Sequence, residues 1–479
     1  MSGRSRIAAL ILPIALLVVA RLALAEPLSE GIAAFNKGDY RTAMERFAAA
    51  VGEHPKDASA HAWLGSAQLR AGDYNAAIAS LSKALELDPK MAEAENNLGS
   101  AYWALAKSAE AVQHYQQAVF LQPHYPAPHY NLGTVYLALQ DPDRAEGEFI
   151  VAVELDPKNA EAHNNLGVAR ERKGRLAEAI ECYQQAVELK PDDHSFRLNL
   201  ALALKNAGRK AEAAQQLARL AAADSTDPTV YLNLGLVRYE RGEYRSALEA
   251  FQQTVSLDPV NAVGYYNLGL CERQLGNEES ARQHFKKAVD LDPGALNARI
   301  NLGAMEIEQG NPAAAAEQFA AALKGNPESY AAGFNLGLAY ARLGNEEDAV
   351  KVWAALAERA PDDAAVHEAL ASTYLRLRRY DQARQEYDAL LKLRPKDVMA
   401  HNNLGIIYEQ FGLLDQAAES YLMALAVDPN YAPAHNNLGV VYERQGKTEA
   451  AISEYRAALK ADPKLEDARR NLSRLAAVE

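Results

Sequence analysis

The sequence predicts an all-α fold, a right-handed superhelical solenoid of 34-residue helix–turn–helix repeats. The first observation is the dipeptide Leu-Gly, which recurs in one phase along the chain; its glycines are Gly65, Gly99, Gly133, Gly167, Gly235, Gly269, Gly303, Gly337, Gly405 and Gly439. The second is a proline that closes almost every repeat, as at Pro89 and Pro123. A fixed period in this range is typical of solenoids, in which each repeat buries its apolar face against the next.

Each repeat is predicted to contain two helices joined by a turn. Small and apolar residues at helical spacing predict a first helix over residues 58–69. Residues 72–73 form the turn, because glycine tolerates the backbone conformation that ends a helix. A second helix, with Ala77 and Leu81 on one face, ends at Pro89, since proline cannot continue a helix.

Two positions of the second helix recur in every repeat. The first holds alanine throughout, from Ala43 to Ala451, and we expect it to mark a close helix crossing that admits no larger side chain. Four residues later stands a large side chain: Phe47, Leu81, Tyr115, Phe149, Tyr183, Leu217, Phe251, Phe285, Phe319, Trp353, Tyr387, Tyr421 and Tyr455. These positions predict the core of each repeat.

This combination of Leu-Gly, alanine, aromatic residue and proline resembles the tetratricopeptide repeat (TPR) family over about residues 24–479. The family's tyrosine, three residues after the glycine, is present as Tyr102, Tyr136, Tyr340, Tyr374, Tyr408 and Tyr442. Histidine replaces the tryptophan that opens the family's pattern at His61, His129, His163, His401 and His435. The resemblance implies a superhelix in which the first helix of each repeat lines the concave face.

We expect three parts in the chain. Residues 1–25 combine arginines, a short apolar run and small residues before Glu26, which predicts a cleaved secretory signal peptide. An uncleaved membrane anchor is the weaker alternative, because a span needs about 20 apolar residues. Residues 26–465 hold about 13 tandem TPR repeats, of which the first is degenerate. Residues 466–479 are expected to form a C-terminal capping helix with a polar outer face.

Composition and motifs argue against catalysis. A net charge of −13 offers no basic stripe for nucleic acid. The sequence has no phosphate-binding glycine loop, Cys-x-x-Cys, His-Glu-x-x-His or Gly-x-Ser-x-Gly. We therefore predict a protein that is not an enzyme and uses no cofactor.

A row of histidines is the most tempting cluster for a metal: His129, His163, His367, His401 and His435. Each stands alone on its helix, and we expect no cysteine or paired carboxylate in phase with it. Histidines packed between helices are therefore the stronger interpretation, and no metal site is predicted.

An asparagine precedes each Leu-Gly leucine in most repeats: Asn97, Asn131, Asn165, Asn199, Asn233, Asn267, Asn301, Asn335, Asn403, Asn437 and Asn471, with Trp63 and Ala369 as the exceptions. Asparagine is a poor helix former, so this asparagine ladder needs a reason. One reason is structural, a bond to the neighbouring repeat that sets the stacking. The other follows from a resemblance to the TPR region of the O-linked N-acetylglucosamine transferases, which implies a ladder that grips an extended peptide backbone. The two are not exclusive.

The neighbours of the ladder suggest a groove. In the middle of the chain they are apolar: Leu198, Leu202, Leu232, Leu236, Tyr266, Leu270, Ile300, Phe334 and Leu338. Towards both ends they are polar, as at Asn96, Asn164, Glu368, Asn402 and Asn436. An apolar stretch with polar rims is typical of a binding surface. The alternative is that these side chains only pack helix against helix.

The expected function is a non-catalytic scaffold at the cell envelope, periplasmic or extracellular, that binds a protein or an extended peptide in the concave groove. Two alternatives remain open. The first alternative is an accessory subunit of an envelope enzyme such as a glycosyltransferase. The second is a scaffold that self-associates. Neither nucleic acid nor a small-molecule cofactor is expected as a partner.

Overall fold

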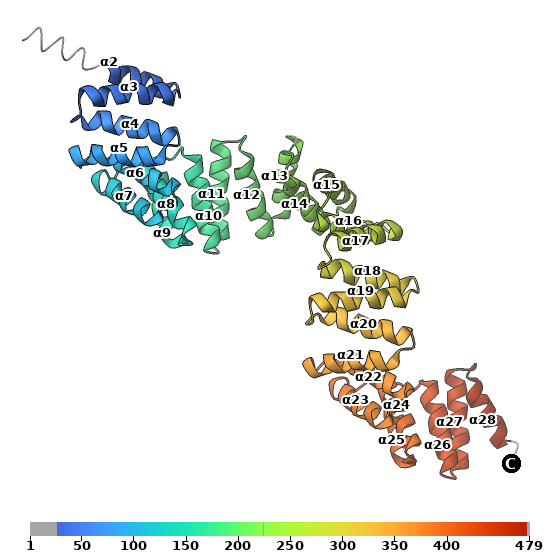
Figure 1. Cartoon of the computed structure of the whole chain (residues 1–479). Helices are drawn as coiled ribbons and strands as arrows, with labels where there is room; N and C mark the ends of the chain where they lie inside the picture. The colour runs from blue at the N-terminus through green and yellow to red at the C-terminus, as the bar shows by residue number, and fades with distance from the viewer. Residues whose placement is uncertain (1–25, 224, 477–479) are drawn as a thin grey trace, which may run out of the picture. The chain divides into compact units, whose positions relative to one another are not determined.

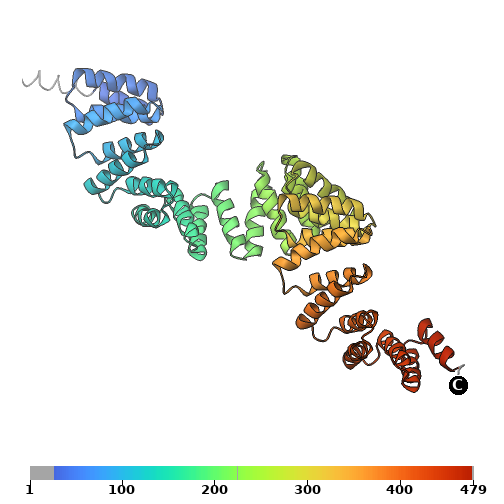
Figure 2. The ribbon, with the colours of Figure 1, turned by 60° about the horizontal axis from the view of Figure 1, so that its bottom comes forward.

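A computed structural model describes residues 26–223 and 225–476; the predicted signal segment 1–25 lies outside them. Within the described residues the chain forms 27 helices and no strand, so the all-α solenoid predicted from the repeat is confirmed (Figure 1). The chain divides into two compact units, an N-terminal unit that ends at Glu243 and a C-terminal unit that begins at Tyr244. Within each unit consecutive helices stack side by side, as Figure 2 shows from a second direction.

The helices of the N-terminal unit are α2 (Glu26–Asn36), α3 (Tyr40–Glu53), α4 (Ala58–Arg70), α5 (Tyr74–Leu87), α6 (Ala92–Ala104), α7 (Ser108–Leu121), α8 (Pro126–Ala138), α9 (Pro142–Leu155), α10 (Ala160–Arg172), α11 (Leu176–Leu189), α12 (His194–Asn206), α13 (Lys210–Ala222) and α14 (Pro228–Glu240).

The helices of the C-terminal unit are α15 (Tyr244–Leu257), α16 (Ala262–Gln274), α17 (Glu278–Leu291), α18 (Leu296–Glu308), α19 (Pro312–Gly325), α20 (Tyr330–Arg342), α21 (Glu346–Arg359), α22 (Ala364–Arg376), α23 (Tyr380–Leu393), α24 (Val398–Gln410), α25 (Leu414–Val427), α26 (Ala432–Arg444), α27 (Thr448–Ala461) and α28 (Glu466–Ala476). Even-numbered helices are the first helices of their repeats, and odd-numbered helices are the second.

The ends of the helices follow local chemistry. At the start of α4, the Asp57 carboxylate accepts a hydrogen bond from the backbone N–H of Ser59 at 2.9 Å, which satisfies a donor that has no partner inside the helix. At its end, Gly72 takes a φ of +84°, and the N–H of Asp73 returns to the carbonyl of Gln68 at 2.9 Å. This left-handed stop lets the chain reverse into α5.

The glycine of the Leu-Gly dipeptide allows the two helices of a repeat to lie close together. A Cβ added at Gly133 in α8 would lie 2.7 Å from the ring of Phe149 in α9, and one added at Gly65 would lie 2.6 Å from Leu81. The alanine of the second helix, such as Ala145, is fully buried beside this contact. The core thus contains a column of large side chains, and most of them pack against the glycine of their own repeat.

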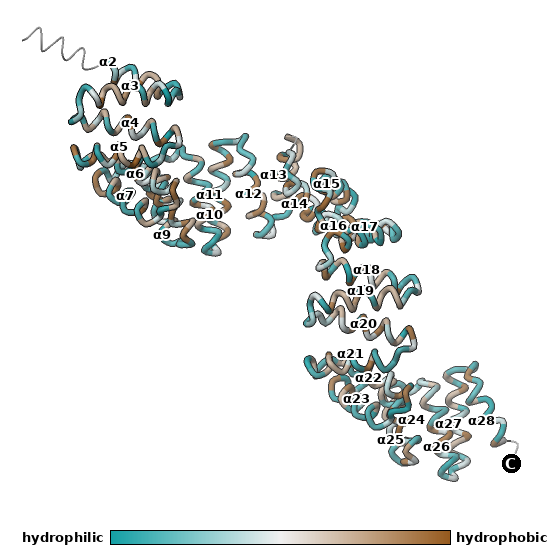
Figure 3. Tube along the Cα trace, in the orientation of Figure 1, coloured by the Kyte–Doolittle hydropathy of each residue, from teal (hydrophilic) through white to brown (hydrophobic). Residues whose placement is uncertain are grey.

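Hydrophobic and hydrophilic stretches alternate along each helix, because one side of the helix packs and the other meets solvent (Figure 3). First helices of consecutive repeats contact each other, as α4 does α6 and α24 does α26. The surface that the first helices form within each unit is called the inner face below. No helix in the ranges 26–223 and 225–476 is long and apolar enough to cross a membrane.

Candidate functional site

The asparagine ladder joins consecutive repeats at several positions of the inner face. In four cases the amide N–H donates to the side-chain oxygen of the asparagine 35 residues earlier: Asn131 to Asn96 at 2.9 Å, Asn199 to Asn164 at 2.9 Å, Asn437 to Asn402 at 3.1 Å and Asn471 to Asn436 at 3.1 Å. The accepting asparagines are buried. Each bond therefore replaces a bond to water and fixes how one first helix sits on the next.

Three other members of the ladder find different acceptors on neighbouring helices. Asn97 donates to the hydroxyl of Ser66 at 2.9 Å, and Asn165 donates to the hydroxyl of Tyr130 at 3.4 Å. Asn403 donates to Tyr387 at 2.8 Å. Burial raises the pKa of Tyr387 to about 12, so its hydroxyl stays neutral and accepts this bond at ordinary pH.

In the middle of the chain the amide N–H groups of the ladder bond within their own helix, while the side-chain oxygens of Asn233 and Asn301 accept hydrogen bonds from Lys205 and Arg273 of the preceding repeat at 2.6 and 3.4 Å. Asn233 donates to the carbonyl of Thr229 at 2.9 Å, Asn267 to Val263 at 2.8 Å and Asn301 to Asn297 at 2.8 Å. Asn233 and Asn267 are only 7% and 5% exposed. Asn301 and Asn335 are half-buried. The residue 35 positions before Asn233 is Leu198, which has no acceptor to offer.

The apolar neighbours of the ladder are all half-buried: Leu198, Leu202, Leu232, Leu236, Tyr266, Leu270, Ile300, Phe334 and Leu338. Several pack on the second helix of their own repeat. The ring of Tyr266 lies 5.8 Å from that of Phe285, and the ring of Phe334 lies 6.2 Å from that of Trp353. These side chains therefore serve the packing of the repeat as well as lining its inner face.

Three members of the histidine row each lie beside a single glutamate, a contact that the repeat pattern did not predict. Nδ1 of His129, His367 and His435 lies 2.5–2.7 Å from the carboxylates of Glu148, Glu386 and Glu454, each on the second helix of the same repeat. Nε2 of the same rings lies 2.9–3.2 Å from a proline carbonyl at the start of the repeat. The histidines thus join the inter-repeat turn to the second helix, and no cluster of three metal-ligating side chains occurs in the described part of the chain.

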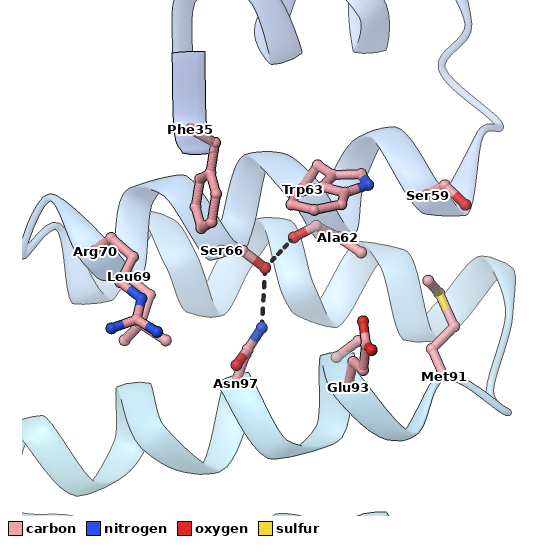
Figure 4. A pocket seen from close by; sticks show the side chains of 11 residues that line it. Phe35, Ser59, Ala62, Trp63, Ser66, Leu69, Arg70, Met91, Glu93 and Asn97 are labelled. Atoms are coloured by element: carbon pink, nitrogen blue, oxygen red, sulfur yellow. Dashed lines mark hydrogen bonds between the residues drawn. The ribbon is translucent and has the colours of Figure 1, made fainter. Parts of the chain in front are cut away.

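A pocket opens on the inner face of the N-terminal unit, between α2, α4 and α6 (Figure 4). Its volume is about 310 Å³, and its lining is Phe35, Ser59, Ala62, Trp63, Ser66, Leu69, Arg70, Met91, Glu93, Ala94 and Asn97. Phe35 comes from α2, the span from Ser59 to Arg70 from α4, and Glu93 and Asn97 from α6, while Met91 precedes α6. Among the predicted site residues, only Asn97 lines it.

One residue that lines this pocket is small for its position in the repeat. Ala62 occupies the position just before the ladder, where the other repeats carry Asn96, Tyr130, Asn164, Leu198, Leu232, Tyr266, Ile300, Phe334, Glu368, Asn402 and Asn436. Trp63, in turn, replaces the ladder asparagine. Comparison of this column of residues between repeats singles out this repeat, whereas the period of the repeat alone does not.

The walls of the pocket are held in place before any ligand arrives. Trp63 packs edge-on against Phe35 at 5.4 Å and stacks on Phe47 at 5.7 Å between ring centroids. Ser66 donates to the carbonyl of Ala62 and accepts from Asn97, so the polar side of the pocket is also ordered (Figure 4). A rigid aromatic wall and a fixed amide lower the entropic cost of binding.

The chemistry of this site suits recognition of a chain segment. The aromatic and aliphatic walls favour an apolar side chain, and the amide of Asn97 uses only one of its two N–H donors on Ser66. No cysteine lines the pocket. Both cysteines are buried elsewhere, and burial raises the pKa of Cys271 to about 12, which leaves that thiol protonated and unreactive.

Comparisons with known proteins agree with the repeat. The family model described as the cilia and flagella-associated protein 70 C-terminal domain, itself built of TPR repeats, matches residues 17–258, just over half of the chain. Two models described as tetratricopeptide repeats match residues 232–295, 368–432 and 416–466, and residues 306–373. No curated protein matches the sequence.

Solved structures give partial likenesses. A thermophilic TPR protein from Thermus thermophilus is 29% identical, with 38% of this chain and 98% of that one covered and a TM-score of 0.33. A tetratricopeptide repeat protein from Parabacteroides merdae is 21% identical, with 52% and 99% covered and a TM-score of 0.37. The C-terminal part of a TPR protein from Cytophaga hutchinsonii is 18% identical, with 50% and 98% covered and a TM-score of 0.45. The family models, together with the repeat and the stacked helix pairs, show that the chain belongs to the tetratricopeptide repeat family.

Proposed function

We propose that this protein is a scaffold that binds an extended segment of a partner protein on its inner face, with the pocket between α2, α4 and α6 as the anchor. Repeats of this family generally mediate contacts between proteins. The observation that carries the proposal is the pocket itself, an ordered hollow on the inner face in the repeat that carries Ala62 where the other repeats carry larger residues. Concave sites with apolar walls and a few fixed polar groups are typical of binding sites.

The asparagine ladder has two roles in this proposal. Where an acceptor stands 35 residues earlier, as for Asn131 and Asn199, the amide sets the stacking of first helices. Each such amide still has a second N–H, and these side chains are half-buried rather than enclosed. A bound backbone that follows the inner face would accept bonds from these remaining donors, so the ladder extends the grip beyond the pocket.

The proposed location is the cell envelope, outside the cytoplasm. Its support is the order of charged, apolar and small residues in the segment 1–25, which is typical of a secretory signal. N-terminal sequencing of protein purified from its native host is expected to begin at Glu26. A protein that retains Ser2 or Met1 would contradict cleavage.

A pocket-filling variant tests the binding function. Ala62→Leu introduces the residue found at the same position as Leu198 and Leu232, so the fold is expected to accept it. Peptides selected from a random library on the wild-type protein should lose affinity about tenfold to a hundredfold on Ala62→Leu, because the pocket no longer buries one apolar side chain. Ala48→Leu, on an exposed position of the second helix α3, is the matched control.

The same experiment separates the other candidate functions. Selected peptides that bind Ala48→Leu and Ala62→Leu equally would contradict the pocket as the anchor. A library that yields no binder, together with dimers or longer assemblies in sedimentation experiments, would favour a self-associating scaffold instead. If the protein is an accessory subunit of an enzyme, it should bind one folded partner protein and none of the short peptides.

A further inference from the structure

We propose that the pocket selects segments in which an apolar side chain stands between a basic and an acidic residue, with the two charges about four positions apart. This inference rests on the proposed function and adds to it the chemistry of the ligand. It is carried by two charged side chains, Arg70 and Glu93, which line the pocket towards opposite ends (Figure 4).

Arg70 is exposed and makes no hydrogen bond or salt bridge within the described ranges 26–223 and 225–476. Arginines at the same position of other repeats are all engaged. Arg172 and Arg342 donate to the carbonyls of Leu137 and Ile307 on the preceding first helix. Arg376 pairs with Glu346, and Arg444 pairs with Glu409. The guanidinium of Arg70 is therefore the exception in its column, and it is the one beside the pocket.

Glu93 shows the same exception for the opposite charge. At the same repeat position Glu161 pairs with Lys190, and Asp467 pairs with Arg470. The carboxylate of Glu93 is exposed and has neither a salt bridge nor a hydrogen bond to any described residue. A free cation and a free anion thus flank one pocket, and a ligand with the complementary pair of charges would satisfy both.

The spacing of the two charges sets the length of the segment. Glu93 is the repeat equivalent of Ser59, so it lies near the start of the first helices, whereas Arg70 lies at the end of α4. At a rise of 1.5 Å per residue, these levels are about 16 Å apart along the helix axis. In an extended five-residue segment the two end residues are four steps of about 3.3 Å apart, and the long side chains of lysine and glutamate cover the remaining distance.

The middle of the pocket explains the apolar residue. Phe35 and Trp63 present apolar surface between the two charges, whereas Leu69 lies beside Arg70 and Met91 lies beyond Glu93 (Figure 4). Met91 occupies the N-cap position of α6, yet it offers no cap, whereas Asp57 and Asp193 cap their helices with a carboxylate. The pocket, with a volume of about 310 Å³, is large enough to admit one large side chain.

Synthetic pentapeptides test the proposal on the full-length mature chain. The probe is acetyl-Lys-Ala-Trp-Ala-Glu-amide with a fluorescent label, and three comparison peptides carry lysine, glutamate or glutamine at both ends. Fluorescence anisotropy is expected to give the mixed-charge peptide the tightest binding, about threefold to thirtyfold tighter than the glutamine peptide at low salt. The advantage should shrink at about 1 M salt, because exposed charges are screened.

Charge reversal on the protein should change the preference rather than remove binding. Arg70→Glu leaves two negative ends, so the lysine peptide becomes the tightest binder; Glu93→Lys leaves two positive ends, so the glutamate peptide does. Both residues are exposed and unpaired, so neither change threatens the fold. The controls are Arg219→Glu and Glu154→Lys, exposed residues of second helices in the same unit, which should leave the order of affinities unchanged.

The outcomes separate this proposal from the function on which it rests. If all four peptides bind equally, and Ala62→Leu weakens all of them, the charge selection is wrong while the pocket remains the anchor. If no peptide binds the wild-type protein, or if Ala62→Leu changes nothing, the anchor itself is wrong and the charge selection falls with it. A switch of preference on both reversal variants, with both controls unchanged, supports the proposal.

Discussion

Three turns of the solenoid hold a residue other than glycine in the left-handed region of the backbone. Ala106, Gln140 and Arg378 take φ values of 58°, 60° and 58°, where the corresponding turns use glycines such as Gly72 and Gly174. In this region the Cβ atom of an L-residue crowds the following carbonyl oxygen, at a cost of roughly 1–2 kcal/mol. These three turns therefore carry local strain. Substitution by glycine, the residue found in the other turns, should relieve it.

We expect Gln140→Gly to stabilise the protein by about 0.5–1 kcal/mol, since relief of strain exceeds the added entropy of the unfolded chain. Urea denaturation followed by circular dichroism measures the change. The reverse substitution, Gly174→Ala, should destabilise by a similar amount. A loss of stability with Gln140→Gly would show that the side chain, and not the backbone, dominates this turn.

Gly133 and Gly147 lie in one helix pair, and we expect their substitution by alanine to have opposite effects on stability. Gly133→Ala places a Cβ 2.7 Å from the Phe149 ring and should cost about 1–3 kcal/mol. Gly147, in α9, has nothing within 4 Å of an added Cβ, so Gly147→Ala should stabilise by about 1 kcal/mol through helix propensity. Thermal melts of both variants test this pair; equal effects would contradict the packing described for the glycine.

His129 predicts a dependence of stability on pH. The hydrogen bond with Glu148 raises the pKa of His129, and the Pro123 carbonyl adds to this effect against the opposing influence of burial. A pKa that is raised by folding gives stability that is complete below the unfolded value of about 6.5 and is lost as the pH rises through the folded value. The wild-type protein should therefore lose more stability than His129→Gln between about pH 6 and pH 9. Parallel pH profiles of the melting temperature would contradict this.

At the scale of the helix, the positions of the asparagine ladder can be predicted from the sequence, but the hydrogen-bond partners of its members cannot. The column of asparagines is visible in the repeat, and a stacking role was one of its two predicted meanings. The actual partner depends on the residue 35 positions earlier, and Asn199 and Asn233 differ because that residue is Asn164 in one case and Leu198 in the other. Such a rule becomes visible only when neighbouring first helices are placed in contact.

This difference predicts unequal costs for removing two members of the ladder. Asn437→Ala should destabilise by about 1–3 kcal/mol, because it removes a partner of the buried oxygen of Asn402. Asn267→Ala should change stability by only a few tenths of a kcal/mol, since its amide bonds a carbonyl of its own helix and alanine is the better helix former. Urea titrations of the two variants provide the measurement. Equal costs would show that bridging between repeats does not stabilise the array.

At the scale of the whole molecule, periodicity predicts most of the fold and little of the site. The first helix expected over residues 58–69 is found as Ala58–Arg70, and the predicted large residues such as Phe149 are fully buried. The pocket could not be predicted from the period because its lining includes departures from that period, Ala62 and Trp63, and side chains of three helices that only the stack brings together. The histidine–glutamate pairs could not be predicted for a related reason, since their contacts depend on side-chain conformations across two helices.

Binding of a partner segment in the pocket of the N-terminal unit can be followed in solution, helix by helix. Hydrogen exchange of the mature chain, with and without a peptide selected on it, tests this binding most directly, because exchange reports each helix separately. We expect slower exchange in α2, α4 and α6 on binding, no change in the helices of the C-terminal unit for a short peptide, and much weaker protection in Ala62→Leu at the same peptide concentration. Protection confined to second helices, or protection of α4 and α6 that persists undiminished in Ala62→Leu, would contradict binding in the pocket.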